Sequence, residues 1–334
     1  MSFNPHILEH DFSRYSDVET SQQVMDTAQK LWDHFSDHEH ILVSTSGGSD
    51  SDTIIHLIHT FAPEMIPKCH FVFVNTGLEY AATKRHLDDL EKWYGIKIER
   101  IRGMSVVTAV RRYGVPILSK MKSHFIDLYL RGWPSGEKLI FQGHIKQWNS
   151  FKFTENQQNM VRYLKEHNIK VSEKCCTYSK KKPFSAVIKQ YNIDLSVTGE
   201  RKSEGGQRAM THKSCFEPYN KTIGAAKFMP LWWWTNAMKA DYKAVNGLVY
   251  SDCYEIWGMT RTGCVGCPFN LNAGEDLQIL KQYEPRMYKA CMNVFGEAYR
   301  LTDQFNCRRK KILPEAEQLT WSDVMPSQKE RSLQ

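Results

Sequence analysis

The stretch ILVSTSGGSDS, residues 41–51, runs from an apolar segment into two glycines, an aspartate and several hydroxyl side chains. Gly47 and Gly48 permit backbone angles that other residues avoid, and they let a ligand approach the main chain. The amphipathic residues 51–61 that follow predict a helix. A strand, a glycine turn and a helix N-terminus together form an anion site, because unpaired N–H groups and the helix dipole both favour negative charge. The stretch therefore predicts a phosphate site.

Apolar runs and helical patterns alternate around this loop. An amphipathic helix is expected before it, since Val24, Ala28 and Leu31 recur at helical spacing. The expected elements are strands at 40–45, 70–75 and 96–101, and helices at 51–61 and 80–93, the second helix ending at Gly95. This βαβαβ order predicts an α/β fold with a parallel twisted sheet flanked by helices. Ligands are expected at the carboxyl ends of its strands.

Composition divides the remainder of the chain into further regions. The expected order is an N-terminal helical segment (1–39), a nucleotide-binding α/β domain (40–210) with a helical insertion (about 104–168), a loop-rich C-terminal region with cysteines (211–310), and a flexible tail (311–334). A further strand is expected within 193–208 and a helix near 275–300. The three tryptophans 232–234 are interpreted as core packing in preference to base stacking.

No apolar run approaches the roughly 20 residues of a membrane helix, and the first residues lack an apolar signal region. The chain is therefore expected to be cytoplasmic and to have no membrane partner. Nine cysteines in that compartment favour metal or redox chemistry over a disulfide framework. The formal net charge of +7 is modest. The basic runs at 180–182 and 308–311 are interpreted as solvated faces, with a phosphate-rich partner as the alternative.

The loop SGGSDS fits neither the Walker pattern nor GxGxxG. It resembles the PP-loop of the ATP pyrophosphatase superfamily, whose motif SGGxDS it matches at every fixed position. Enzymes of that superfamily cleave ATP between its α and β phosphates, adenylate an acceptor oxygen and release pyrophosphate. The resemblance implies an adenine nucleotide α-hydrolase-like fold, with Asp50 near Mg²⁺. The implied catalytic residues are Ser46, Asp50 and Ser51, and the implied nucleotide-binding residues are Ser44, Ser46, Gly47, Gly48, Ser49, Asp50 and Ser51. The alternative is a glycine–serine turn that binds nothing.

Two further segments resemble phosphoadenylyl-sulfate (PAPS) reductases. FVFVNTGLEY, residues 71–80, resembles their strand followed by a Thr-Gly loop and an acidic residue. VTGERKSEGGQR, residues 197–208, resembles their arginine loop around the phosphate or sulfate of the nucleotide, an oxyanion that guanidinium groups bind in bidentate fashion. The implied nucleotide contacts are Asn75, Thr76, Gly77, Glu79, Gly199, Arg201 and Arg208, with Lys202 as a weaker candidate. A common turn and an exposed charged loop are the alternatives.

The cysteines include a tandem pair, Cys175 and Cys176, and a CxxC pair, Cys264 and Cys267. A CxxC pair alone serves zinc, iron–sulfur and redox sites alike. A tandem pair followed about 80–90 residues later by CxxC resembles the [4Fe–4S]-binding sulfonucleotide reductases. That resemblance implies these four cysteines as ligands, with the lysines at 180–182 offsetting the negative charge.

The ligand set remains open, because adjacent side chains in extended chain point apart. The C component of bacterial DNA phosphorothioation systems, which is also similar, combines one upstream cysteine with a CxxC pair and another cysteine. Cys215, Cys253 or Cys291 is therefore an alternative ligand in place of Cys175 or Cys176. A structural zinc site, and thiols without metal or in a redox disulfide, are the alternatives to a cluster. Cys69 and Cys307 are expected to pack as small apolar residues.

Two departures from the reductases decide between the functions that the resemblance implies. No cysteine follows Cys307, whereas the reductases carry a nucleophilic cysteine in a C-terminal Glu-Cys-Gly-Leu-His motif. The glycine loop is also intact, whereas reductases usually carry an altered one. Both departures favour an enzyme that binds ATP and Mg²⁺, releases pyrophosphate and adenylates an acceptor for sulfur insertion, with a [4Fe–4S] cluster in preference to zinc.

The implied partners are DNA or tRNA as acceptor, a sulfur donor such as a cysteine desulfurase, and a second copy of the chain. The net charge of +7 agrees with a nucleic-acid acceptor. Two other functions stay open: a PAPS or adenylyl-sulfate reductase, and a non-catalytic module that binds nucleotide and metal.

Overall fold

A computed structural model describes residues 3–142, 152–205, 212–221 and 223–314. The chain divides into two compact units, and each unit is built from two stretches of sequence. The first unit comprises residues 1–105 and 176–264, and the second comprises residues 106–175 and 265–334. The predicted domain boundaries (1–39, 40–210, 211–310, 311–334) stay a prediction.

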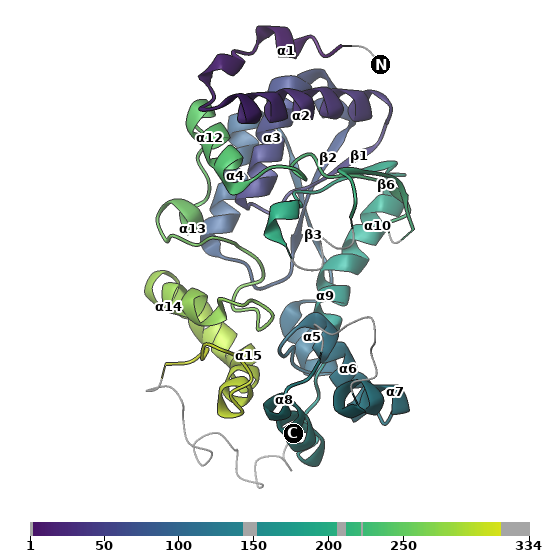
Figure 1. Ribbon diagram of the computed structural model, residues 1–334, viewed down its shortest axis with the longest axis vertical. Coiled ribbons are helices and arrows are strands. Elements are labelled where there is room, and N and C mark those ends of the chain that lie inside the picture. Colours follow the sequence, from purple (N-terminus) through teal and green to yellow (C-terminus); the bar gives the residue numbers. More distant parts are fainter. Residues whose placement is uncertain (1–2, 143–151, 206–211, 222, 315–334) are drawn as a thin grey trace. The chain divides into compact units, whose positions relative to one another are not determined.

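The first unit is built on a six-stranded sheet with the order β3–β2–β1–β4–β6–β5 (Figure 1). Its strands are β1 (Ile41–Ser44), β2 (Cys69–Asn75), β3 (Ile98–Arg102), β4 (Leu195–Val197), β5 (Phe216–Asn220) and β6 (Ala225–Phe228). Neighbouring strands are parallel, except that β5 runs antiparallel to β6. The predicted parallel sheet is thus confirmed. The β5–β6 hairpin was not predicted and lies in a stretch expected to be loop-rich.

Helices cover both faces of this sheet. Its α-helices are α1 (His6–Glu9), α2 (Val18–Ser36), α3 (Ser49–Phe61), α4 (Ala81–Tyr94), α10 (Lys182–Gln190), α12 (Asn236–Asn246) and α13 (Asp252–Glu255), and α9 (Lys174–Cys176) crosses from the second unit into the first. Shorter turns are the 3-10 helices η1 (Phe12–Arg14), η2 (Pro63–Lys68) and η6 (Lys202–Glu204), and the π-helical η5 (Thr177–Lys181). Helix α4 ends at Gly95, as predicted, because this glycine adopts a left-handed φ of 60°.

Alternating strand residues supply two apolar layers. Ile41 and Val43 of β1 belong to the larger core, which also contains apolar residues of α2, α3, α4 and α12. Leu42 of β1 and Val187 of α10 belong to the smaller core on the opposite face. Helices α3 and α4 therefore cover one face of the sheet and α10 covers the other, as expected for a right-handed doubly wound fold.

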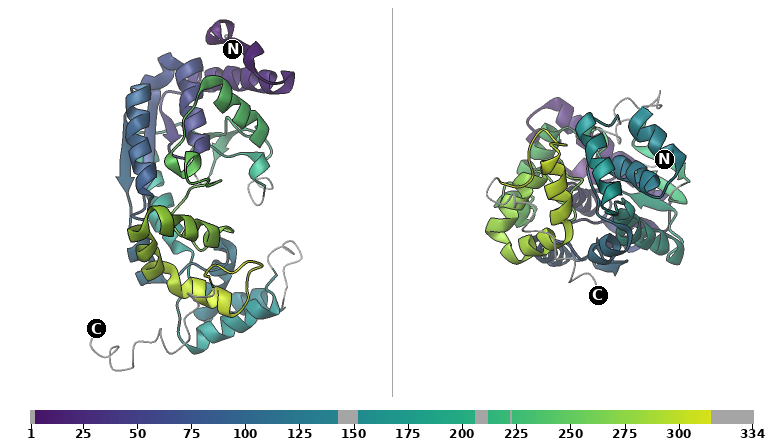
Figure 2. Two further views of the ribbon diagram at one scale, coloured as in Figure 1. Left: turned by 90° about the vertical axis from the view of Figure 1, so that its left-hand side faces the viewer. Right: turned by 90° about the horizontal axis from the view of Figure 1, so that it is seen from below.

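The second unit contains helices and no named strand among its described residues. Its elements are α5 (Val106–Tyr113), α6 (Lys120–Leu130), α7 (Pro134–Glu137), the π-helical η3 (Lys138–Gln142), α8 (Glu155–Glu166), α14 (Ala273–Tyr283) and α15 (Pro285–Gln304). The helix predicted near 275–300 is two helices, α14 and α15, which contact one another (Figure 2). The break falls at Pro285, because a proline disfavours helical angles in the residue before it. Within the described ranges, no helix has the length and apolar character needed to span a membrane.

Candidate nucleotide-binding site

The glycine loop connects β1 to α3 at the carboxyl end of β1. Strand β1 lies between β2 and β4 in the sheet. The chain passes from β1 to β2 and β3 on one side of β1, whereas β4 and the later strands lie on the other side. The loop after β1 therefore lies at the topological switch point of the sheet. The N–H of Thr45 donates to the carbonyl of Val72 at 2.9 Å, which extends the β1–β2 pairing by one residue. Gly47 adopts a φ of 63°, and α3 begins at Ser49, two residues earlier than predicted. A strand, a glycine turn and a helix N-terminus are therefore all present.

Ser51 organises the inside of the loop. Its hydroxyl oxygen accepts the N–H groups of Ser46 and Gly48, each at 3.2 Å, and donates to the carbonyl of Gly48 at 2.8 Å. The Ser46 and Ser51 hydroxyl oxygens are 3.1 Å apart. Ser51 is only 4% exposed. In this conformation its hydroxyl shapes the loop, which is a different task from the catalytic one implied by the family resemblance.

A later segment of the first unit lies against the loop. A Cβ atom at Gly48 would come within 3.1 Å of the Tyr254 hydroxyl and 3.3 Å of the Thr262 hydroxyl. These two hydroxyls are 2.9 Å apart, and the N–H of Thr262 donates to Tyr254 at 3.1 Å. A side chain at position 48 would therefore meet close contacts, and Tyr254 and Thr262 are neighbours of the site that the sequence motifs did not identify.

Gly47 offers a direct test of the loop geometry. A Cβ at this position would lie 2.8 Å from Thr83 Cγ2, and threonine is stiff about χ1, so the contact cannot be relieved cheaply. Gly95 is a matched control, since it has a φ of 60° and a Cβ added there would have no atom within 4 Å. We expect Gly95→Ala to lower the free energy of unfolding by about 1 kcal/mol. Gly47→Ala should cost about 1–3 kcal/mol more and weaken nucleotide binding.

The comparison uses urea denaturation of both variants and titration with ATP. Because the left-handed backbone is common to the two sites, the difference between the variants isolates the contact with Thr83. Equal losses of stability, with unchanged ATP affinity, would show that the loop relaxes freely around a methyl group.

Asp50 lies between two cations. Its Oδ1 is 2.9 Å from Arg201 Nε and 2.8 Å from Lys239 Nζ. The Lys239 ammonium also donates to the Ser49 hydroxyl at 2.8 Å. Arg201 is 6% exposed, and its Nη1 donates to Ser203 at 3.0 Å and to Asn236 at 2.8 Å. The structure thus brings the predicted Arg201 to the loop, where it contacts the predicted Asp50.

Gly199 also packs on the loop, because a Cβ at this position would lie 3.0 Å from Asp50 Cβ. Ser44, the last residue of β1, pairs in register with Val72. Arg208 lies outside the described residues. Lys202 is exposed, and its ammonium lies 4.8 Å from the centre of the Trp233 ring. Packing was the interpretation for tryptophans 232–234, and it is confirmed for Trp232 and Trp234, which are fully buried, while Trp233 is 41% exposed.

The NTGLE segment after β2 forms a closed turn. The N–H and hydroxyl of Thr76 donate to Glu79 Oε1 at 3.1 and 2.6 Å, and the N–H of Gly77 donates to Asn75 Oδ1 at 2.9 Å. Glu79 is 5% exposed, and its burial raises the pKa of the carboxyl although Lys180 acts to lower it. All four predicted residues therefore lie at the carboxyl end of the strand next to β1, with their polar groups partly used in the turn.

Two predicted metal ligands share one polar cluster within the first unit. Burial raises the pKa of the Cys264 thiol, and Lys180 acts to lower it. Burial acts to lower the pKa of Lys180, but the Cys264 and Glu79 charges and a hydrogen bond to Cys264 outweigh it, so this pKa is raised. The charge of Cys176 also raises the pKa of Lys180, and the Thr76 side chain forms a hydrogen bond with the Cys264 thiol. We call Thr76, Glu79, Cys176, Lys180 and Cys264 the Lys180 cluster.

The remaining predicted ligands are divided between the two units. Cys175 and Cys267 belong to the second unit, as does the buried Cys291, whose thiol lies 3.4 Å from the carbonyl of Val265. Cys253 is buried on α13 and Cys215 packs beside the larger core. All nine cysteines fall in the described ranges and none is in a disulfide. Across those ranges, no three His, Cys, Asp or Glu side chains are grouped so that they could hold a metal ion.

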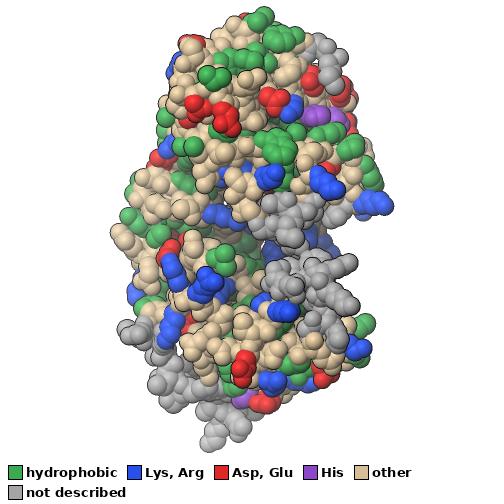
Figure 3. Space-filling view, in the orientation of Figure 1, with side chains coloured by type: hydrophobic (Ala, Val, Ile, Leu, Met, Phe, Trp, Pro, Cys, Tyr) green, Lys and Arg blue, Asp and Glu red, His purple; other side chains and the backbone are tan. Residues whose placement is uncertain are grey.

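The basic runs were predicted to be solvated faces, and this is wrong for Arg308. Its guanidinium donates to the carbonyls of Asn270 at 2.7 Å and Leu118 at 3.3 Å, and also to Pro268. Lys180 is likewise half-buried in its cluster. Local charge patterning cannot reveal such partners, because they are distant in sequence. On the face shown in Figure 3, acidic side chains lie among the basic ones.

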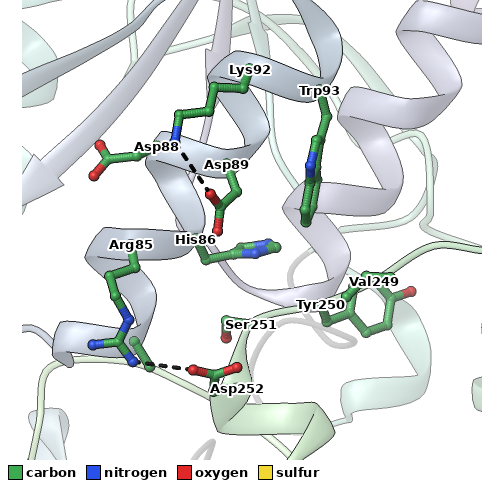
Figure 4. Close-up of a pocket in the computed structure, with 11 residues that line it drawn as sticks. Arg85, His86, Asp88, Asp89, Lys92, Trp93, Val249, Tyr250, Ser251 and Asp252 are labelled. Atoms are coloured by element: carbon green, nitrogen blue, oxygen red, sulfur yellow. Dashed lines mark hydrogen bonds and ion pairs between the residues drawn. The ribbon is translucent and has the colours of Figure 1, made fainter.

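A pocket of about 390 Å³ lies beside α4 in the first unit (Figure 4). His86 lines it, and its Nε2 is 2.7 Å from Asp52 Oδ2, with both side chains under 5% exposed. Burial raises the pKa of Asp52. Burial acts to lower the pKa of His86, but the hydrogen bond and charge of Asp52 outweigh it and raise this pKa. Asp52 follows Ser51 directly, so this buried pair anchors α3 to α4 immediately after the loop.

The model of the phosphoadenosine phosphosulfate reductase domain matches residues 40–116 and 141–270. An uncharacterized protein of Methanocaldococcus jannaschii is 26% identical over 260 residues, which are 77% of this chain and 42% of that protein. An adenosine 5'-phosphosulfate reductase of Neisseria meningitidis serogroup B is 26% identical over 125 residues, which are 37% of this chain and 48% of the enzyme. The chain thus spans less than half the length of these relatives.

Among solved structures, the chain is similar to the U34-tRNA thiolase NcsA of Methanococcus maripaludis, which was solved with its [4Fe–4S] cluster. The TM-score is 0.38, the sequence identity is 13%, and the match covers 92% of this chain and 84% of the thiolase.

Proposed function

The chain belongs to the phosphoadenosine phosphosulfate reductase domain family, and from that premise we propose that it is an ATP pyrophosphatase that adenylates an acceptor for sulfur insertion. One observation carries the proposal: the intact SGGSDS loop joins a strand to a helix at the switch point of the sheet, with Asp50 between Arg201 and Lys239. A loop of this kind presents N–H donors and a helix dipole to phosphate.

The proposed reaction transfers AMP to the acceptor. The acceptor oxygen attacks the α-phosphorus of ATP, the bond between that phosphorus and the α–β bridging oxygen breaks, and pyrophosphate leaves with the bond's electron pair. A proton leaves the acceptor hydroxyl if the acceptor carries one. The adenylated oxygen is then a good leaving group. Hydrosulfide, released from the persulfide of a sulfur donor by a thiol reductant, attacks the acceptor atom that bears this oxygen, the bond between that atom and the oxygen breaks, and AMP leaves with the electron pair. When bound, Mg²⁺ would neutralise part of the negative charge of the phosphates.

The residues at the loop have separate roles in this reaction. Gly47 and Gly48 keep the main chain open to the phosphates, and Ser51 holds the loop in shape through the N–H groups of Ser46 and Gly48. Asp50 is the carboxylate suited to Mg²⁺, a cation that prefers oxygen ligands. Arg201 supplies positive charge at the same point, because its Nε lies 2.9 Å from Asp50 Oδ1.

We further propose that the protein carries a [4Fe–4S] cluster. The Lys180 cluster supports this, since it brings the thiols of Cys176 and Cys264 near one half-buried ammonium, which suits thiolate ligands. The other ligands come from Cys175, Cys267 and the alternatives Cys215, Cys253 and Cys291. The cluster would supply electron transfer or sulfur handling, and no step of adenylation depends on it.

Nucleic acid, DNA or tRNA, is the proposed acceptor, and a cysteine desulfurase is the proposed kind of sulfur donor. The net charge of +7 supports a polyanionic acceptor. The test is pyrophosphate release by anaerobically purified protein with ATP and Mg²⁺, against no acceptor, DNA, tRNA and adenylyl sulfate. We expect DNA or tRNA to stimulate release. No pyrophosphate under any condition, with ATP bound, would contradict the proposal and favour a non-catalytic module.

The likeness to an adenosine 5'-phosphosulfate reductase favours a second candidate, reduction of a sulfonucleotide to sulfite. This reaction needs a nucleophilic cysteine outside the metal site. Cys307 is 8% exposed, and burial raises the pKa of its thiol to about 12, so its thiolate is scarce at neutral pH. Sulfite release with thioredoxin, lost in Cys307→Ser, would nevertheless establish the reductase.

A further inference from the structure

Lys239 reaches the glycine loop from helix α12, and it was not among the predicted site residues. Its Nζ lies 2.8 Å from the Ser49 hydroxyl and 2.8 Å from Asp50 Oδ1, and its side chain is 15% exposed. Met238 and Tyr242 of the same helix are buried in the first unit. The Thr235 hydroxyl caps the helix by accepting the N–H of Met238 at 3.1 Å. The backbone that carries Lys239 is therefore held in place against the loop.

The charges at this point do not balance. One carboxylate oxygen of Asp50 faces both Lys239 and Arg201, so these three side chains together carry one positive charge in excess. The other acidic residue in the first turn of α3, Asp52, pairs with His86. The Arg201 side chain is over nine-tenths buried, and its Nε makes no hydrogen bond of acceptable geometry, although it lies 2.9 Å from Asp50. An ammonium has three N–H donors, so the contacts with Ser49 and Asp50 leave capacity for another acceptor. A buried cation excess is best matched by an anion.

We propose that Lys239 binds the terminal phosphates of ATP and thereby selects a nucleoside triphosphate over nucleotides with fewer negative charges. This inference rests on the proposed function and adds a specificity-determining residue to it. Coulomb attraction grows with the ligand's charge, and the β and γ phosphates carry more charge than the terminal sulfate of a sulfonucleotide. A lysine on α12 therefore favours ATP over adenylyl sulfate and AMP.

The test compares nucleotide affinities by calorimetry in the holoprotein and its variants. Lys239→Gln should weaken ATP binding about tenfold or more, because a charge-assisted contact to phosphate is lost. AMP affinity should change less than about threefold, and Lys239→Arg should restore most of the ATP affinity. Lys243→Gln is the matched control, since Lys243 lies one turn along α12 and pairs with Glu255 at 2.6 Å. It should leave the affinities for ATP, AMP and adenylyl sulfate unchanged.

A second comparison separates binding from mere neutralisation of Asp50. If Lys239 contacts phosphate, Lys239→Gln should still weaken ATP binding in an Asp50→Asn background; if it acts only through Asp50, the two effects will not add. Equal losses for ATP and AMP, or no effect of Lys239→Gln, would overturn the inference even where the wild-type protein releases pyrophosphate. Selective ATP binding lost in Lys239→Gln, without pyrophosphate release by any form, would uphold it and refute the proposed function.

Discussion

Asp50→Asn is expected to reduce pyrophosphate release at least about a hundredfold, because the amide is a much poorer Mg²⁺ ligand and an aligned metal is worth several kcal/mol in such transfers. Asparagine is preferred to alanine since it keeps the size of the side chain. Its Oδ1 can still accept hydrogen bonds from Arg201 and Lys239, which contact that atom at 2.9 and 2.8 Å. The fold should therefore survive. The measurement is steady-state pyrophosphate release with the stimulating acceptor, together with thermal unfolding.

Asp26→Asn is the control for loss of a carboxylate. Asp26 lies on α2 with 47% of its side chain exposed and pairs with Lys30 at 2.6 Å. Surface pairs of this kind contribute little, so we expect unchanged turnover and a stability within about 1 kcal/mol of wild type. Retained turnover in Asp50→Asn at unchanged Mg²⁺ dependence would mean that the aspartate has no part in the reaction and serves only to hold Arg201.

The alternation of strands and helices from residue 40 to 102 was predictable from the sequence, because each element there has its own periodicity and its own turn signal. The SGGSDS loop followed from local chemistry in the same way. Gly95 terminates its helix as expected, since a left-handed residue at a helix end needs no distant partner. Predictions of this kind depend on neighbours in sequence, which the chain displays directly.

The part of the site that could not be predicted comes from contacts between distant residues. Lys239 and Asp50 are 189 positions apart, and nothing local to either residue indicates that they meet. The pairing of Asp52 with His86 is similar, because a histidine on a helix is more often a solvated or core residue than a buried ionic partner. The β5–β6 hairpin was missed because short strands with mixed polarity, such as Phe216–Asn220, have no clear period of two.

The cysteines show the same limit. Spacing alone grouped the tandem pair with the CxxC pair. In the structure, Cys176 and Cys264 act on the same Lys180, while Cys291 lies beside Val265, the residue after Cys264, within the second unit. The ligand set therefore has to be decided by experiment, with each cysteine changed in turn.

Cys264→Ser is expected to lower the iron content and visible absorbance of anaerobically purified protein more than about tenfold, since a serine hydroxyl does not replace a thiolate in binding iron. The Lys180 ammonium would then lose one of the charges that raise its pKa. If the cluster is structural, the free energy of unfolding should also fall, because metal binding is coupled to folding. Iron, zinc and sulfide are measured per chain, followed by urea denaturation.

Cys69→Ser is the control, because this half-buried thiol donates to the carbonyl of Met65 at 3.4 Å, a contact that serine can keep. Its iron content should equal that of wild type. The same measurement on Cys215→Ser, Cys253→Ser and Cys291→Ser assigns the remaining ligands. Only a variant in which a true ligand has been replaced will lose iron as Cys264→Ser does. Stoichiometric zinc with no iron in the wild-type protein would refute the cluster. A fully active Cys264→Ser protein would show that adenylation proceeds without it, as expected if the cluster acts only at the sulfur step.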